Sequence, residues 1–190
     1  MDNDGILVNL IAYPVKVLGP GERIGLWTQG CTLACSGCMS MHTWDFDEKK
    51  HMSIDDIVSK VRTFNADSIT ISGGEPFQQP NLLVLLKALK RAGIKDIMLY
   101  SGYRETYIRK HFSDCLPYID VLVCEPFIDG DESEAIYKGS ENQRMIILND
   151  ALLSKYESYA KKSKEKRLQK FNDVIVGIPY QRDIKALYEM

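Results

Sequence analysis

The sequence lacks a long hydrophobic run and a strong net charge. No apolar stretch is long enough to span a bilayer, and the acidic start has no basic region leading into an apolar stretch, as a signal peptide would. A formal net charge of −2 provides no field that would attract nucleic acid or an anionic membrane surface. We therefore expect a cytoplasmic protein with neither kind of partner.

Histidine and tryptophan are also scarce, while cysteine is present as an odd and unevenly placed set. The 190 residues are 45% hydrophobic and 26% charged, which suits one soluble domain with a real core. Three of the five cysteines, Cys31, Cys35 and Cys38, fall in one short stretch, the cysteine loop (residues 30–38). Cysteines this close together do not form a disulfide framework, and in a reducing cytoplasm such groups usually bind metal or perform redox chemistry.

Strand and helix patterns alternate over the first 125 residues, which indicates an α/β fold with right-handed βαβ units and a parallel sheet. Predicted strands cover residues 8–17, 23–29, 68–72, 96–100, 119–124 and 143–148, and predicted helices cover residues 53–64, 81–92 and 103–112. Ser53 is the expected N-cap of the first helix. Ligands bind at the carboxyl ends of parallel strands, so residues 73–75, 101–103 and 124–125 should share one face with the cysteine loop.

The composition becomes strongly charged after Asp150. We predict a solvated helix over residues 151–170, with a docking surface for a partner as the alternative. A last strand is expected at 174–179 and a terminal helical turn at 184–188. The chain is thus divided into a main domain, residues 1–150, and an appended charged helix and strand, residues 151–190.

Two kinds of metal site are compatible with the cysteine loop. A closed zinc site needs four ligands, usually in two pairs, and the candidate fourth ligands His42, Cys115 and Cys124 have no spacing that indicates zinc. An iron–sulfur cubane fits better, because thiolates from one short loop can hold it. Three thiolates leave one iron without a protein ligand, and an open metal position can bind a substrate or cofactor.

The spacing Cys-x3-Cys-x2-Cys is the signature of the radical S-adenosylmethionine (SAM) superfamily. The loop Gly73-Gly74-Glu75-Pro76, which follows the next predicted strand, resembles the Gly-Gly-Glu-Pro motif of that superfamily. The resemblance implies a compact partial (β/α) barrel of the radical SAM type, with parallel strands, outer helices and an open side. It also implies a [4Fe–4S] cluster, held by the three cysteines, whose free iron binds the amino and carboxylate groups of SAM.

Several polar residues are candidates for contacts with SAM. Gly73 and Gly74 lack side chains, which lets the backbone approach a ligand closely, and the Glu75 carboxylate can accept hydrogen bonds from an amine. Further candidates, for the ribose and carboxylate of SAM, are Ser101, Asn142 and Gln143. Strand-end capping is the alternative role for these three residues.

Other side chains near these motifs have two possible roles each. Arg23 and Arg144 are candidate partners for the SAM carboxylate. Cys124 is expected to be a small buried hydrophobe, with hydrogen-atom donor or auxiliary ligand as alternatives. Trp27 and Trp44 flank the cysteine loop, and their packing would shield a cluster and tune its potential.

Further motifs resemble the glycyl-radical-enzyme activating proteins, in particular the activators of anaerobic ribonucleoside-triphosphate reductase. The matching stretches are Gly19-Pro20-Gly21-Glu22-Arg23, Thr28-Gln29-Gly30-Cys31, Thr43-Trp44-Asp45, Tyr100-Ser101-Gly102-Tyr103, Val121-Leu122-Val123 and Lys138-Gly139-Ser140-Glu141-Asn142-Gln143. The resemblance implies that one electron from a reduced cluster cleaves SAM to a 5′-deoxyadenosyl radical, which takes a hydrogen atom from a glycine of the partner reductase. It also implies flavodoxin or ferredoxin as the electron donor.

The sequence departs from those activators in three places. Cys124-Glu125-Pro126 stands where they commonly have Asp-Gly, Met39 stands where they often have tyrosine, and the tail from Ala151 exceeds the shortest of them. Two other functions therefore remain open. One is a stand-alone radical SAM enzyme that modifies a small molecule or peptide, and the other is a non-catalytic iron–sulfur or zinc-binding interaction protein.

Overall fold

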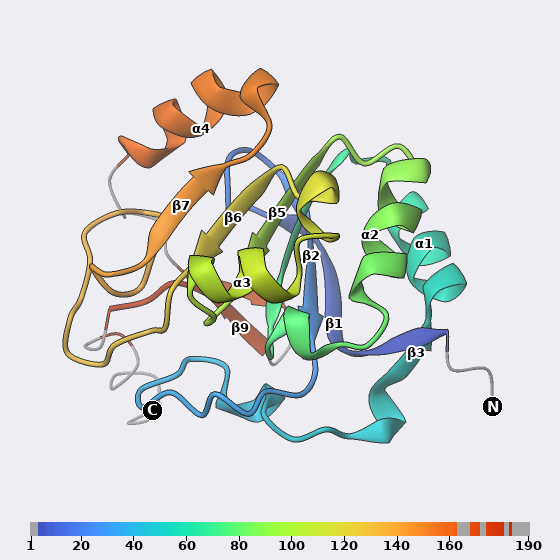
Figure 1. Cartoon of the computed structure of the whole chain (residues 1–190), viewed down its shortest axis with the longest axis horizontal. Coiled ribbons are helices and arrows are strands. Elements are labelled where there is room, and N and C mark those ends of the chain that lie inside the picture. Colours follow the sequence, from blue (N-terminus) through green and yellow to red (C-terminus); the bar gives the residue numbers. More distant parts are fainter. Residues whose placement is uncertain (1–3, 163–167, 172–173, 181–182, 184–190) are drawn as a thin grey trace.

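The computed structural model describes residues 4–162, 168–171, 174–180 and 183. Its centre is a seven-stranded sheet with the strand order β3-β1-β2-β4-β5-β6-β7 (Figure 1). The four middle strands are parallel: β2 (Arg23–Thr28), β4 (Ser68–Gly73), β5 (Asp96–Tyr100) and β6 (Val121–Cys124). The predicted α/β class with a mostly parallel sheet is confirmed.

Both margins of the sheet differ from the prediction, because their strands are antiparallel. The long first strand β1 (Gly5–Val15) pairs antiparallel with β2 and with the short β3 (His51–Ser53), and β7 (Arg144–Ile147) pairs antiparallel with β6. Residues 16–22, which include the predicted turn at 19–21, join β1 to its antiparallel neighbour β2, so this connection is a hairpin and not a crossover. Within the described residues β3 and β7 form the two edges of the sheet, and the predicted partial barrel is not confirmed.

Helices α1 (Ile54–Arg62), α2 (Leu82–Arg91) and α3 (Glu105–His111) connect successive parallel strands. The predicted N-cap is present, because the Ser53 hydroxyl accepts a hydrogen bond from Asp56 N at 3.1 Å. Short 3-10 turns complete the connections at Met41–Thr43, Glu48–Lys50, Pro76–Gln78, Leu116–Tyr118 and Asp150–Leu152.

Alternate residues of each parallel strand face opposite sides of the sheet, and each side buries a core. Ile97 and Leu99 of β5 pack with α1, α2 and α3, while Met98 between them packs on the other side with Tyr156 and Tyr159. Cys115 and Cys124 belong to the helix-covered core. The strands are therefore buried on both faces, as expected for the parallel part of a sheet.

The charged tail differs most from its prediction. The only part of residues 151–170 that forms an α-helix within the described chain is α4 (Leu153–Ala160), and Leu168–Lys170 belongs to strand β8 (Leu168–Phe171). Nor is α4 a solvated helix, since Tyr156 is fully buried and Tyr159 is 3% exposed. Helix α4 covers the end of the sheet opposite the cysteine loop (Figure 1).

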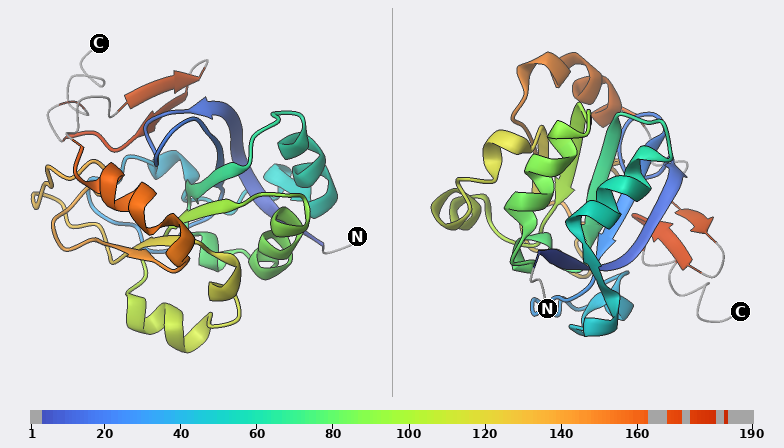
Figure 2. Two further views of the ribbon diagram at one scale, coloured as in Figure 1. Left: turned by 90° about the horizontal axis from the view of Figure 1, so that it is seen from above. Right: turned by 90° about the vertical axis from the view of Figure 1, so that its right-hand side faces the viewer.

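The predicted last strand is present as β9 (Val174–Gly177), which pairs antiparallel with β8 in a separate two-stranded sheet. We call this pair the C-terminal hairpin; it lies beside β1 (Figure 2). The predicted turn at 184–188 lies outside the described residues. The division at residue 150 stays a prediction. No helix in the described segments is both long and apolar enough to cross a membrane.

Candidate active site

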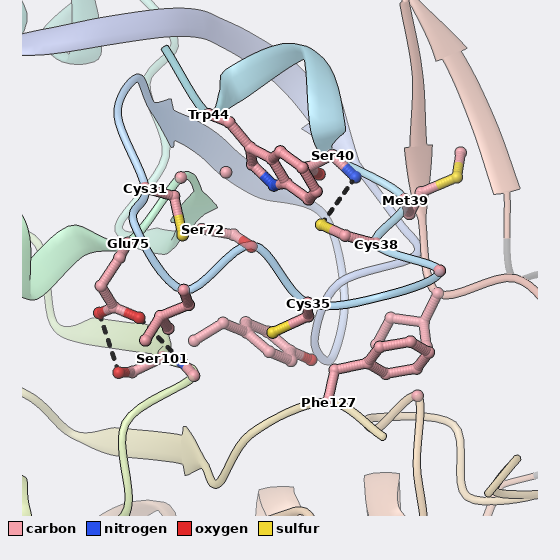
Figure 3. A pocket seen from close by; sticks show the side chains of 18 of the residues that line it. Cys31, Cys35, Cys38, Met39, Ser40, Trp44, Ser72, Glu75, Ser101 and Phe127 are labelled. Carbon is pink, nitrogen blue, oxygen red and sulfur yellow. Dashed lines mark hydrogen bonds between the residues drawn. The ribbon is translucent and has the colours of Figure 1, made fainter. Parts of the chain in front are cut away.

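A cavity of about 190 Å³ lies where the parallel strands end. The cysteine loop, the ends of β4 and β5 and the C-terminal hairpin all contribute to its walls (Figure 3). The predicted site residues among its lining are Cys31, Cys35, Cys38, Gly73, Gly74, Glu75, Ser101 and Gln143. Of the segments predicted to share one face with the cysteine loop, residues 73–75 and 101–102 do line the same cavity, whereas residues 124–125 are not among its described lining. The ligand-binding roles of these residues stay predictions.

Backbone hydrogen bonds fix the cysteine loop at its start. Cys31 N donates to Trp44 O at 2.9 Å, and Gly30 O accepts from Glu75 N at 3.0 Å. Left-handed backbone at Ala34 (φ 48°) and Gly37 (φ 69°) then turns the chain back on itself. The loop therefore curls around the cavity and does not run straight past it.

The side chains of Cys31, Cys35 and Cys38 all extend toward this cavity (Figure 3). No three Cys, His, Asp or Glu side chains in the described part of the chain gather tightly enough to hold a single metal ion. A closed zinc site requires such a gathering, whereas a cubane has one iron for each thiolate to bind. Three thiols distributed around one cavity therefore fit a cluster better than one ion.

The candidate fourth zinc ligands do not line this cavity. Cys115 and Cys124 lie in the hydrophobic core, with 6% and 0% exposure. Burial raises the pKa of the Cys124 thiol to about 12, which keeps it protonated and a poor ligand. His42 lies beside a neighbouring smaller cavity, next to Trp27 and Met39. The structure thus agrees with the expectation that Cys124 is a buried small hydrophobe.

The glycine pair has a packing role in addition to the ligand contact that was expected. A Cβ on Gly74 would lie 2.4 Å from Gly30 O, and a Cβ on Gly73 would lie 2.7 Å from the backbone of Thr28. Gly73 also has a φ of 100°, which L side chains rarely adopt. Both glycines are required by the close approach of two protein segments, the end of β4 and the start of the cysteine loop. Their backbone also lines the cavity.

Glu75 is a buried carboxylate, 1% exposed, in a fixed position. Its Oε1 accepts hydrogen bonds from the Ser101 hydroxyl at 2.9 Å and from Phe77 N at 3.1 Å, and its Oε2 accepts one from Gly102 N at 2.8 Å. Burial raises the pKa of Glu75 to about 7, although the three donors favour the ionised form. No basic side chain donates to it in the described residues, so the carboxylate suits a cationic ligand.

The remaining polar candidates separate into two groups. Gln143 lines the cavity, and its side-chain oxygen accepts a hydrogen bond from Gly139 N at 2.9 Å. Asn142 is not among the described residues of the lining; its amide donates to Pro126 O at 2.7 Å and its oxygen accepts from the Ser140 hydroxyl. For Asn142 this geometry favours the alternative role of loop capping.

Neither arginine candidate reaches the cavity. Arg23 is 0% exposed and forms an ion pair with Asp96 of 3.1 Å, and its Nε donates to Thr70. It therefore stabilises the interior of the sheet, and its predicted contact with the SAM carboxylate is wrong. Arg144 pairs with Glu105 at 2.9 Å near the surface.

Sequence reasoning missed several residues of the cavity wall. Tyr100 and Phe127 belong to it, as do Gly177, Ile178 and Pro179 from the tail. The Tyr100 hydroxyl is buried without a hydrogen-bond partner in the described structure. The position of Tyr100 could have been predicted, because Tyr100 precedes Ser101 at the end of a predicted strand. The position of residues 177–179 could not, because an apolar strand does not reveal which part of the protein it packs against.

Comparison with known proteins gives the same assignment as this geometry. Residues 17–146 match the family described as a 4Fe-4S single cluster domain. The anaerobic ribonucleoside-triphosphate reductase-activating protein of Haemophilus influenzae is 33% identical over 144 residues, which cover 69% of this chain and 92% of the relative. The chain belongs to this family of activating proteins.

A second activating protein agrees with the first. The protein of that name from Vibrio cholerae is 32% identical, with the same coverage of 69% and 92%. A crystal structure of QueE from Escherichia coli shares 21% identity and aligns with a TM-score of 0.45 over 52% of this chain and 53% of that one. Membership confirms the predictions of a 4Fe–4S domain and of an enzyme of the activating type.

Proposed function

We propose that this protein is a radical SAM enzyme that activates an anaerobic ribonucleotide reductase by removing a hydrogen atom from one of its glycines. The observation that carries the proposal is the shared cavity, in which three thiols of one loop face a buried carboxylate and glycine backbone. The names of the 33% and 32% identical relatives support the reductase as the partner. The partial barrel of the radical SAM type and the cytoplasmic location are part of the same proposal.

The three thiols would hold the cluster as thiolates. Burial raises the pKa of the Cys31 and Cys35 thiols, so deprotonation on binding iron costs more here than in water. A [4Fe–4S] cluster held there would supply, when reduced, the electron that cleaves SAM into methionine and a 5′-deoxyadenosyl radical.

Glu75 would orient SAM through its amine. The carboxylate is held by Ser101, Gly102 and Phe77, so it needs no rearrangement to receive a cation. Because burial raises its pKa to about 7, a bound cation would draw the group into its ionised form. SAM affinity should therefore increase as the pH rises through about 7, provided that Glu75 holds the amine.

The apolar part of the wall would keep water from the reacting groups. Trp44, Leu33 and Phe127 line the cavity, together with backbone that presents no side chain at Gly73 and Gly74. A dry pocket protects a reactive radical from side reactions. Gln143 holds the loop at Gly139 in place, which positions Phe127 beside it.

The test is anaerobic reconstitution with iron and sulfide, reduction by dithionite, and addition of SAM. We expect 5′-deoxyadenosine, and a glycyl radical detected by electron paramagnetic resonance when the reductase from the same source is present. Reduced flavodoxin or ferredoxin should replace dithionite. Nucleoside formation without a radical on the reductase would favour the stand-alone enzyme, and no nucleoside at all would favour the non-catalytic binding protein.

A further inference from the structure

The tail of the chain supplies one wall of the reaction cavity. Gly177, Ile178 and Pro179 line the same cavity as Cys35 and Cys38, although they follow these cysteines by more than a hundred residues. A second cavity, of about 70 Å³, is lined by residues 174–178 together with Met39 and Ser40 just beyond the cysteine loop. The C-terminal hairpin therefore lies against the loop that carries the thiols (Figure 3).

Packing and hydrogen bonds fix the hairpin to the body of the protein. Val176 is 4% exposed and packs in one cluster with Trp27. The Gln169 side chain accepts a hydrogen bond from Lys16 N at 2.9 Å and donates one to Pro14 O at 2.6 Å, which ties β8 to the end of β1 (Figure 2). The wall is consequently held in place on its N-terminal side.

The wall is also held beyond Pro179. Tyr180 is 6% exposed, and its hydroxyl donates to Glu134 Oε2 at 2.5 Å. Glu134 belongs to the long segment between β6 and β7 that also contributes Gly139 to the cavity. Residues 177–179 are thus fixed at both ends, so their distance from the thiols is set by the fold.

This wall is additional to the part that the chain shares with its relatives. The family model ends at residue 146, and the match that takes up 92% of the Haemophilus influenzae protein uses only 69% of this chain. The hairpin therefore adds a boundary to a cavity whose other walls come from the shared region.

We propose that Ile178 is a specificity-determining residue, which limits the width of the group that can approach the three thiols. The proposal rests on the function proposed above. Of the three wall residues, Gly177 has no side chain and Pro179 has a rigid ring, so Ile178 is the wall residue whose side chain can vary in size and shape. It lines both cavities and packs against the cluster that contains Trp27 and Val176. A narrowed cavity admits glycine most readily, because its reacting carbon carries no side chain.

Thiol alkylation of the full chain, before iron is added, tests the wall without any need for catalysis. Two reagents are compared, small iodoacetamide and bulky pyrene maleimide. Ile178→Ala should raise the rate with the maleimide about fivefold and the rate with iodoacetamide less than about twofold, because access limits only the larger reagent. Ile178→Trp should lower the maleimide rate. The control is Lys170→Ala, at an exposed position of the same hairpin, which should change neither rate.

Equal maleimide rates in the parent, Ile178→Ala and Ile178→Trp proteins would overturn the proposal, as would an equal rise with both reagents. Thermal melts identify a variant that has unfolded. If Ile178→Ala has unfolded, Ile178→Val, which removes one methyl group, has to raise the maleimide rate instead. After reconstitution, Ile178→Ala should release more 5′-deoxyadenosine for each glycyl radical formed. If the parent protein cleaves no SAM, the proposed function fails. The alkylation rates would still show whether Ile178 limits access to the three thiols.

Discussion

The cysteine loop and the C-terminal hairpin line one cavity, but only the loop has a sequence that indicates a ligand. The loop carries three thiols within residues 30–38, and its spacing identifies the kind of ligand. Strand β9 of the hairpin is a short run of ordinary aliphatic residues, and Ile178 directly after it lines the cavity only because the fold brings it there. Chemistry can be recognised from the types and spacing of side chains, whereas a packing surface depends on its partner.

The role of the cysteine loop would be tested most sharply by removing one thiol from the loop and, separately, one thiol from the buried core. Cys35→Ala should abolish assembly of the cluster, because one of three thiolates that hold it is lost. The expected result is loss of the broad iron–sulfur absorbance and of 5′-deoxyadenosine formation, while the far-ultraviolet circular dichroism stays unchanged.

The matched control is Cys124→Ala, which removes a buried thiol from the core. It should retain the cluster and lower the free energy of unfolding by about 1 kcal/mol. Loss of the cluster in the control would contradict the assignment of ligands.

A second test concerns the contact between the glycine pair and the cysteine loop. Gly74→Ala places a Cβ 2.4 Å from Gly30 O, and backbone on both sides leaves little room for adjustment. We expect a loss of about 3–4 kcal/mol in the free energy of unfolding, measured with urea. In Gly93→Ala the new Cβ meets nothing within 4 Å and only the φ of 97° is unfavourable. In that control the free energy of unfolding should fall by only about 1–2 kcal/mol. Equal losses would mean that the contact is not what requires glycine.

The third prediction uses the raised pKa of Glu75. Since its pKa is about 7 in the folded protein against an ordinary value of 4.5, the native state binds more protons than the unfolded state between these values. The free energy of unfolding should therefore fall as the pH rises from about 4.5 to about 7, by about 3 kcal/mol from this group. Glu75→Gln keeps the size of the side chain and removes the ionisation. The difference between the two proteins across this pH range isolates the carboxyl group, and a difference that does not vary with pH would refute the assignment.

Much of the shared region could be predicted from sequence. The order of strands and helices, the N-cap at Ser53 and the meeting of the thiols with Glu75 all followed from local patterns and from the position of polar residues after strands. The direction of β1 could not be derived from alternation alone, because the turn at residues 19–21 also permits a hairpin. The prediction for Arg23 was wrong for a related reason. The sequence alone does not show whether an arginine in a strand contacts a ligand or pairs with a buried carboxylate such as Asp96.

The tail was predicted least well, because its interactions are with residues far away in the sequence. The charges of residues 151–170 suggested a solvated helix, but Tyr156 and Tyr159, one helical turn apart in α4, are buried against the sheet. Tyr156 is fully buried and its hydroxyl donates to Asp96 Oδ1 at 2.6 Å, sixty residues earlier in the chain. A count of charges identifies the exposed face of such a helix and contains no information about its buried face.

The smallest expected effect separates the structural contribution of the tail from its effect on the cavity. Tyr156→Phe removes the hydroxyl that donates to Asp96, while Arg23 and Lys155 still pair with this carboxylate. Because the carboxylate keeps both partners, the loss should be limited to about 1–2 kcal/mol in the free energy of unfolding. Tyr107→Phe, on the exposed surface of α3, should stay within about 0.5 kcal/mol. Both variants should assemble the cluster as the parent does, since α4 lies at the opposite end of the sheet. If Tyr156→Phe impaired the cluster without lowering stability, the two ends of the sheet would be coupled, and the tail would act on the site through α4 as well as through Ile178.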